Sequence, residues 1–248
     1  MSGRSEFPES GKRTYRHSEP LPVEWVSGGD PELIAAVDAH VEAHIGPISW
    51  VYHEIVSQYV HVDVHCVPPG PDRPFQALVT SGMAERPMNT GGEVEGIRHA
   101  ELMAVLPPEW DLSDEALKDE RHYWPVRWLK SLAVFPHAYG TWLGAGHTVP
   151  TGDPAEPLAD GVAFTAVLLL PSVLFPPDVH RFRTPSGKAV DVFCIVPLYP
   201  EELELKLRQG VGALLDRFDR HGVNELIRPD RVNVARRRWR LPWTTPGR

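Results

Sequence analysis

The stretch Val60-His61-Val62-Asp63-Val64-His65-Cys66 alternates apolar and polar side chains without interruption. Because successive side chains of a β-strand point to opposite faces, this pattern predicts a strand with one apolar face and with His61, Asp63 and His65 on the other. The proline-rich run at 68–71 predicts a turn, and residues 75–80 predict a returning strand. We therefore expect a β-hairpin at this point in the chain.

Further elements are predicted on both sides of the hairpin. Apolar runs indicate buried strands at residues 101–106, 162–170 and 190–196. Apolar residues at spacings of three and four indicate helices at residues 31–45, 125–136 and 200–218. The first helix has Asp30 as its cap, Pro31 at its first position and Gly46 at its exit. Because helices and strands are interspersed without a regular repeat, we expect an α+β fold, with a mixed, mainly antiparallel sheet packed with helices.

The composition divides the chain into a central domain and two polar ends. Residues 1–22 are rich in Ser, Glu, Arg and Pro, so we expect this N-terminal segment to be disordered. Residues 23–235 contain every predicted element and no low-complexity linker, which predicts one domain. Residues 236–248 begin with four arginines around Trp239, and we interpret them as a basic, solvated tail.

The charge and hydropathy favour a protein partner over nucleic acid or a membrane. The formal net charge is −8, whereas sequence-independent binding to nucleic acid needs clustered Lys and Arg. An acidic surface instead attracts a basic partner. The N-terminus lacks the apolar core of a signal peptide, and no apolar run approaches the ~18 residues that cross a bilayer. Because Cys66 and Cys194 both lie within apolar runs, we expect a cytoplasmic protein without disulfides.

A search for reactive groups finds only weak candidates. The side chains of His61, Asp63 and His65 would lie on one strand face at successive spacings of about 6–7 Å and could bind zinc or iron, but a hydrogen-bonded polar face is the favoured interpretation. The sequence contains no nucleophile elbow, P-loop or complete zinc-protease motif. We therefore expect no enzyme and no cofactor, and a metal-dependent hydrolase is a minor alternative. Glu101, at the head of a strand, is expected to pair with Arg73 or Arg86.

The segment 142–157 differs in kind from the rest of the chain. It concentrates Trp142, three glycines, His147, Asp153 and several prolines in one long predicted loop. Long loops inside compact domains often carry function, and tryptophan is a frequent interface anchor. The alternative is a structural loop whose tryptophan fills the core. The residues themselves leave both interpretations open.

Several blocks of the sequence resemble the Suppressor of fused family. They are Val60–Pro69, Arg73–Phe75, Leu78–Met83, Arg86–Asn89, Ala100–Trp110, Trp124–Lys130, Thr141–Pro150 and Pro197–Glu202. The blocks follow the family's order over residues 50–235 and are rich in Trp, Pro, Gly and Met. In the family, Asp or Glu commonly precedes the Thr-Trp-Leu-Gly motif. This chain has Gly140 at that position. The chain is therefore identified as a single-domain bacterial member of that family.

The resemblance implies an α/β sandwich that binds another protein. Bacterial members are proposed as immunity proteins of polymorphic toxin systems, so the expected partner is a toxin domain. The acidic charge of this chain favours a basic one. Animal members restrain a transcription factor in Hedgehog signalling with the help of a second, C-terminal domain, which we do not expect after Arg248. A cytoplasmic regulatory scaffold that sequesters another protein is the alternative. The resemblance implies a partner-binding surface made of Trp142, Gly146, His147, Asp153, Asp63 and Arg86, and it leaves the oligomeric state open.

Overall fold

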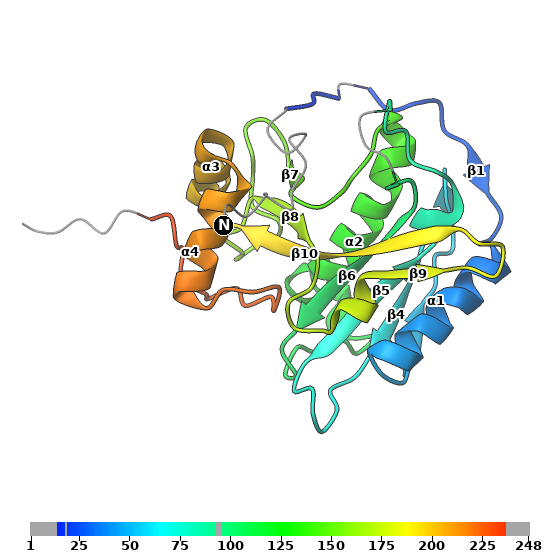
Figure 1. Cartoon of the computed structure of the whole chain (residues 1–248). Helices are drawn as coiled ribbons and strands as arrows, with labels where there is room; N and C mark the ends of the chain where they lie inside the picture. Colours follow the sequence, from blue (N-terminus) through cyan, green and yellow to red (C-terminus); the bar gives the residue numbers. More distant parts are fainter. Residues whose placement is uncertain (1–13, 18, 93–95, 237–248) are drawn as a thin grey trace, which may run out of the picture.

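The computed structural model describes residues 14–17, 19–92 and 96–236. Within them, an eight-stranded sheet has the path β2-β4-β5-β6-β10-β8-β7, and β9 also pairs with β10 (Figure 1). The strands are β2 (Trp50–Tyr52), β4 (Asp63–Val67), β5 (Gln76–Ser81), β6 (Ala100–Leu106), β7 (Thr148–Pro150), β8 (Ala166–Leu170), β9 (Arg181–Arg183) and β10 (Ala189–Leu198). Only the pairing of β6 with β10 is parallel among these, so the expected mixed, mainly antiparallel sheet is confirmed.

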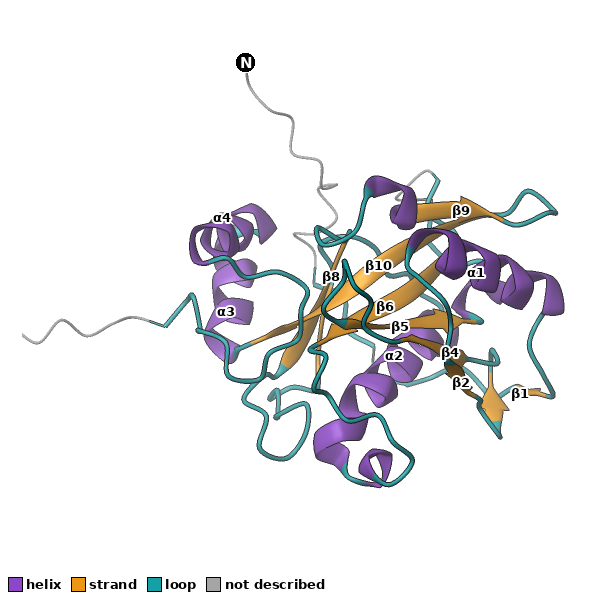
Figure 2. Cartoon of the chain, turned by 90° about the horizontal axis from the view of Figure 1, so that it is seen from below, coloured by secondary structure: helices purple, strands orange, loops and turns teal. Residues whose placement is uncertain are grey.

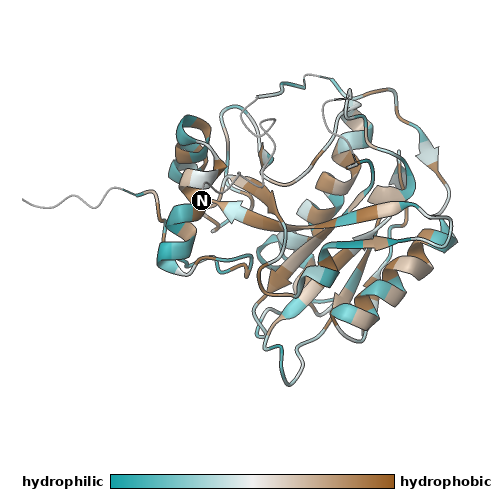
Figure 3. Ribbon diagram, viewed as in Figure 1, coloured by the Kyte–Doolittle hydropathy of each residue, from teal (hydrophilic) through white to brown (hydrophobic). Residues whose placement is uncertain are grey.

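Helices cover both faces of this sheet. Helix α1 (Pro31–His44) packs on one face and α2 (Glu120–Tyr139) on the other, on opposite sides of the strands in Figure 2. Helices α3 (Pro200–Gln209) and α4 (Val211–His221) pack at the β8 end. Strands β4, β5 and β6 are buried at every residue, because neither face of the sheet centre meets water. In Figure 3 brown, hydrophobic segments accordingly run along the central strands, whereas β9 is largely teal.

The predicted hairpin and first helix are confirmed. Strands β4 and β5 pair antiparallel, with Asp63 opposite Ser81. Helix α1 begins at Pro31, and the Asp30 carboxylate accepts a hydrogen bond from the Glu32 amide at 3.0 Å, as expected of an N-cap. Its first inward residue is Leu33, which is 1% exposed.

The second helix is longer at both ends than predicted. It begins after Asp119, whose carboxylate accepts a hydrogen bond from the Arg121 amide, and it ends at Gly140, which has a left-handed φ of 59°. Both Pro125 and Pro136 lie inside the helix. Each removes one backbone hydrogen bond, but both are buried against the sheet, and that packing offsets the loss. The expected boundaries, set at these two prolines, were therefore wrong.

The helix predicted over residues 200–218 is two helices. Gly210 has φ 87° and ψ 167°, which ends α3 and starts α4 at the next residue. A side chain rarely adopts such a backbone conformation, whereas glycine does so without steric cost. The two helices form a small third cluster with Leu168 and Val196 of the sheet.

The first described residues lie along the outside of α2 and lead to a small ribbon. The Leu21 amide donates to the Ala138 carbonyl at 2.6 Å, and the Tyr59 hydroxyl donates to the Leu21 carbonyl. Strand β1 (Trp25–Val26) then pairs antiparallel with β3 (Ser57–Gln58). Short 3-10 helices complete the fold: η2 (Met83–Glu85), η3 (Ala116–Lys118) and η4 (Pro177–His180). Residues 1–13 of the segment expected to be disordered, and 237–248 of the expected basic tail, lie outside the described residues.

Candidate functional site

A cavity of about 190 Å³ lies between the C-terminal half of α2, the following loop, and α3. We call it the Lys206 cavity. Its lining residues are Thr14, Tyr15, His17, Phe135, Thr141, Trp142, Leu143, His147, Thr148, Val149, Pro150, Leu203, Lys206 and Leu207. Most of them are apolar or aromatic, and they come from segments far apart in the sequence. The cavity reaches the surface, because Tyr15 and Leu207 are 40% and 59% exposed.

The loop that begins at Trp142 forms one wall of this cavity. The Trp142 ring is 5% exposed and packs in the main core, with its centroid 4.2 Å from that of His147. A Cβ on Gly144 would lie 2.9 Å from the Trp142 ring, so glycine permits this close packing. The Gly146 amide donates to the Leu169 carbonyl, which ties the loop to β8. Trp142 therefore both fills the core and lines the cavity.

Lys206 is the charged residue of the cavity that the sequence did not single out. It is 5% exposed, and its ammonium donates to the Thr148 hydroxyl at 3.2 Å. Burial lowers the pKa of Lys206, because desolvation disfavours the charged amine. Among the described residues, no carboxylate forms an ion pair with it. The only sequence signal is its position three residues after Leu203, on a face that is otherwise apolar.

The other expected binding residues lie outside the cavity. Asp153 is exposed and lies 3.8 Å from the guanidinium of Arg16. Arg86 makes a bidentate pair with Glu24, at 2.6 and 2.9 Å. Asp63 is almost buried in β4. Trp142 and His147 thus line the cavity, and Gly146 lies in the loop between them. Asp153 contacts Arg16 beside the cavity, whereas Asp63 and Arg86 are not among the lining residues.

The expected row of His61, Asp63 and His65 is a hydrogen-bonded network. The Asp63 carboxylate lies 3.1 Å from a ring nitrogen of His61 and 3.1 Å from one of His53, and it accepts from the Glu54 amide. His65 instead contacts the Ser81 hydroxyl at 2.7 Å. In the part of the chain that the structure describes, no three His, Cys, Asp or Glu residues are arranged to hold a metal ion. The polar-face interpretation accounts for every one of these contacts.

Ser57 extends this network to a hydroxyl–imidazole–carboxylate series. Its hydroxyl lies 2.7 Å from Nδ1 of His61, whose Nε2 lies 3.1 Å from Asp63. The same three groups occur in serine hydrolases, where the hydroxyl must reach a substrate. Ser57 is only 2% exposed, so its hydroxyl is enclosed in this structure. The series links the strand β3 to His61 and to Asp63 of β4.

Glu101 has backbone partners and not the arginine we expected. Its carboxylate accepts from the Thr80 hydroxyl at 2.5 Å and from the amides of Gly82 and Ala84 at 2.9 Å each. It is 0% exposed, and desolvation raises its pKa to about 7 despite these hydrogen bonds. The expected pairing was wrong because Arg73 donates to three backbone carbonyls, those of Ile45, Pro68 and Phe75, and Arg86 pairs with Glu24. Glu101 thereby fixes the turn after β5.

Comparison with known families identifies the fold. The family model for Suppressor of fused protein matches residues 58–232, which is more than half of the chain. The chain belongs to the Suppressor of fused family. The resemblance seen in its Trp-, Pro- and Gly-rich blocks is therefore confirmed. No curated protein matches the sequence.

Solved structures share the Suppressor of fused fold with this chain. A structure from Neisseria gonorrhoeae described as a homologue of the family has a TM-score of 0.58 at 16% identity and covers 84% of this chain and 97% of its own. The Sufu–Fu complex has a TM-score of 0.57 at 18% identity, covering 84% and 93%. Drosophila Suppressor of Fused has a TM-score of 0.53 at 18% identity, and the match covers 54% of that chain. At these identities the likeness establishes the fold.

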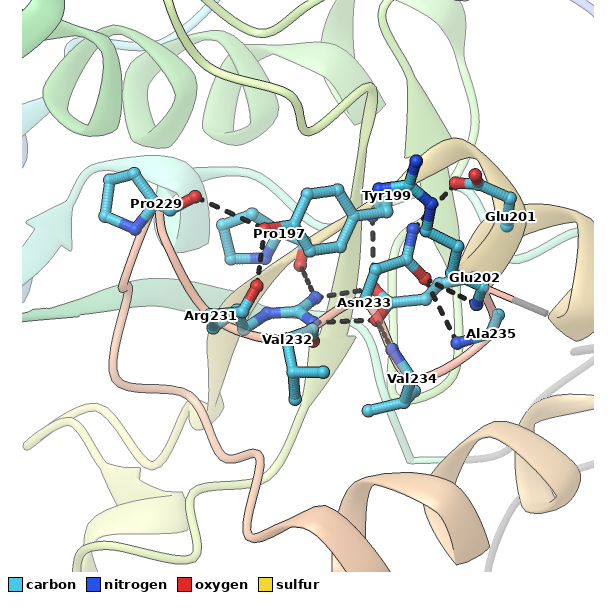
Figure 4. Close-up of polar contacts among 11 residues, drawn as sticks. Pro197, Tyr199, Glu201, Glu202, Pro229, Arg231, Val232, Asn233, Val234 and Ala235 are labelled. Carbon is cyan, nitrogen blue, oxygen red and sulfur yellow. Dashed lines mark hydrogen bonds and ion pairs between the residues drawn. The ribbon is translucent and has the colours of Figure 1, made fainter. Parts of the chain in front are cut away.

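In this Suppressor of fused domain a buried ion pair fastens the C-terminal segment to α3 (Figure 4). The Glu202 carboxylate is 0% exposed and accepts from the Arg231 guanidinium, from the Tyr199 amide and from the Val234 amide. The guanidinium also lies 4.9 Å from the Tyr199 ring centroid and donates to the Pro197 carbonyl. These contacts hold residues 226–236 beside the helix whose next turn carries Lys206.

Proposed function

We propose that this Suppressor of fused domain is a protein-binding module and not an enzyme, and that it acts as an immunity protein that blocks a toxin domain by occlusion. The observation that carries the proposal is the Lys206 cavity with its exposed apolar rim of Tyr15 and Leu207. An apolar cavity surrounded by exposed aromatic and aliphatic groups suits an anchor side chain of another protein. The Sufu–Fu complex, whose fold this chain shares, supports a protein as the occupant.

The charge of the chain favours a basic partner in the cytoplasm. A net charge of −8 accelerates encounter with a positively charged domain, such as a nuclease, through long-range attraction. No helix among the described residues is long and apolar enough to cross a membrane. An immunity protein with these properties would meet its toxin in the cytoplasm, where the toxin would otherwise act.

Co-expression with a candidate toxin domain, taken from the genes adjacent to this one, tests the proposal. Wild-type protein should restore growth, and Leu207→Arg should abolish the protection because it places a charge on the apolar rim. Val173→Arg is the matched control, because Val173 is 75% exposed and does not line the cavity. A toxin that kills equally well in the presence of the wild-type protein would refute the immunity role. Binding without protection would favour the regulatory scaffold.

A further inference from the structure

Among the described residues, Lys206 differs from two other enclosed cations that have a carboxylate partner. The Arg231 side chain is 8% exposed and pairs with Glu202, and the Lys130 side chain is 17% exposed and pairs with Glu54 at 3.1 Å. Lys206 is 5% exposed, yet its only polar side-chain partner among the described residues is the neutral hydroxyl of Thr148. Buried charges in proteins are normally paired, because desolvation without a counter-charge is costly. Within residues 14–17, 19–92 and 96–236, the Lys206 ammonium therefore has no counter-charge.

The surroundings of Lys206 define what could supply that counter-charge. The cavity has a volume of about 190 Å³, the size of one inserted side chain and much smaller than a peptide segment. Phe135, Leu143, Val149 and Leu203 make its walls apolar, so they suit the methylene groups of the inserted chain. The amine of Lys206 among these apolar walls favours an anionic end group, which would stabilise its charged form. A carboxylate on a short aliphatic stem meets both conditions.

We propose that the Lys206 cavity receives a glutamate or aspartate side chain of the partner protein, whose carboxylate pairs with the Lys206 ammonium. The inference rests on the protein-binding function proposed above. The exposed rim of Tyr15 and Leu207 offers apolar contacts beyond the cavity itself, so it favours a protein over a small carboxylate as the ligand. The net charge of −8 does not oppose it, because a partner that is basic overall still carries individual acidic residues, and the Lys206 charge is local.

A random-peptide library displayed on phage provides the probe. Wild-type protein and Lys206→Met serve as parallel baits, since the Met side chain matches that of Lys as far as Cε and lacks the charged ammonium. Lys118→Met is the matched control, because the Lys118 side chain is 71% exposed and pairs with Glu115 away from the cavity. Wild type and control should both enrich peptides with Glu or Asp flanked by apolar residues, and Lys206→Met should lose that enrichment. Circular dichroism confirms that the variants are folded.

The best peptide is then synthesised with Glu and with Gln at the enriched position. Wild-type protein should bind the Gln form at least tenfold more weakly, whereas Lys206→Met should distinguish the two forms by less than twofold. The inference is overturned if the library shows no enrichment of Glu or Asp. It is equally overturned if the change from Glu to Gln weakens peptide binding by the same factor in wild type and in Lys206→Met. It is also overturned if 4-methylpentanoate binds as tightly as the peptide, which would assign the cavity to a small carboxylate.

The same variant in the toxin assay separates the two proposals. If Lys206→Met protects cells as well as wild type does, the acidic anchor is wrong and the protein-binding function stands. If the wild-type protein itself fails to protect, the immunity role is wrong, whatever the peptides show. If Lys206→Met fails to protect cells while wild type and Lys118→Met still protect them, the result supports both the immunity role and the acidic anchor.

Discussion

The buried carboxyl group of Glu101 should make the stability of this domain depend on pH. The group is 0% exposed, and its pKa is raised from 4.5 to about 7 by desolvation. The folded state therefore holds a proton that the unfolded state releases at lower pH. Below about pH 4.5 both states are protonated and the stability contribution of this proton is fully present. It is lost as the pH rises through the window from 4.5 to about 7.

The size of the effect follows from that window. At about 1.4 kcal/mol per pH unit, the interval from 4.5 to about 7 corresponds to roughly 3 kcal/mol of unfolding free energy. About 2 kcal/mol of this change falls between pH 5 and pH 8. Other groups also contribute to the pH dependence of stability, because burial lowers the pKa values of His99 and His137 from their ordinary value. A reference protein that shares those groups is therefore needed.

Glu101→Gln is that reference, because it keeps the shape of the side chain and does not titrate. Its amide oxygen can still accept from the Gly82 and Ala84 amides, but one acceptor for the Thr80 hydroxyl is lost, which costs about 1 kcal/mol at pH 5. Urea unfolding of both proteins at pH 5, 6, 7 and 8 gives the difference in free energy. That difference should move by about 2 kcal/mol in favour of the variant as the pH rises. If the unfolding free energies of the two proteins change equally with pH over this range, that result refutes the argument.

Two other substitutions test the buried ion pair of Arg231 with Glu202 and the close backbone contact at Gly82. Arg231→Met should lower the unfolding free energy by about 3–5 kcal/mol, because it leaves the buried Glu202 carboxylate without its counter-charge; urea unfolding equal to wild type would contradict a stabilising pair. Gly82→Ala should cost at least about 3 kcal/mol or prevent folding, since a Cβ there would lie 1.8 Å from the His61 carbonyl oxygen at a φ of +127°. Gly161→Ala, at a φ of +76° with no atom within 4 Å, is its control and should cost only about 1 kcal/mol in thermal unfolding.

Sequence reasoning succeeded for elements that depend on neighbouring residues. The alternation at 60–66 predicted the hairpin, and Asp30 with Pro31 predicted the start of α1. It failed where packing outweighs local preference. Pro125 and Pro136 disfavour a helix interior, yet burial on the sheet keeps both inside α2. The expected arginine partner of Glu101 is wrong, because the sequence does not reveal that Thr80 of β5 and two amides of the following turn surround its carboxylate.

The sequence by itself determined the family, the α+β class and the residues of the Trp142 loop. Only the tertiary structure decided that this loop meets α3 and residues 14–17 around the Lys206 cavity, and that Asp153, Asp63 and Arg86 do not line it. The physical reason is that periodicity and capping act between residues close in the chain, whereas a buried charge depends on side chains brought together from distant segments. Lys206 lies in the helix sequence among other charged residues, and only burial by Trp142 and its neighbours makes its ammonium unusual.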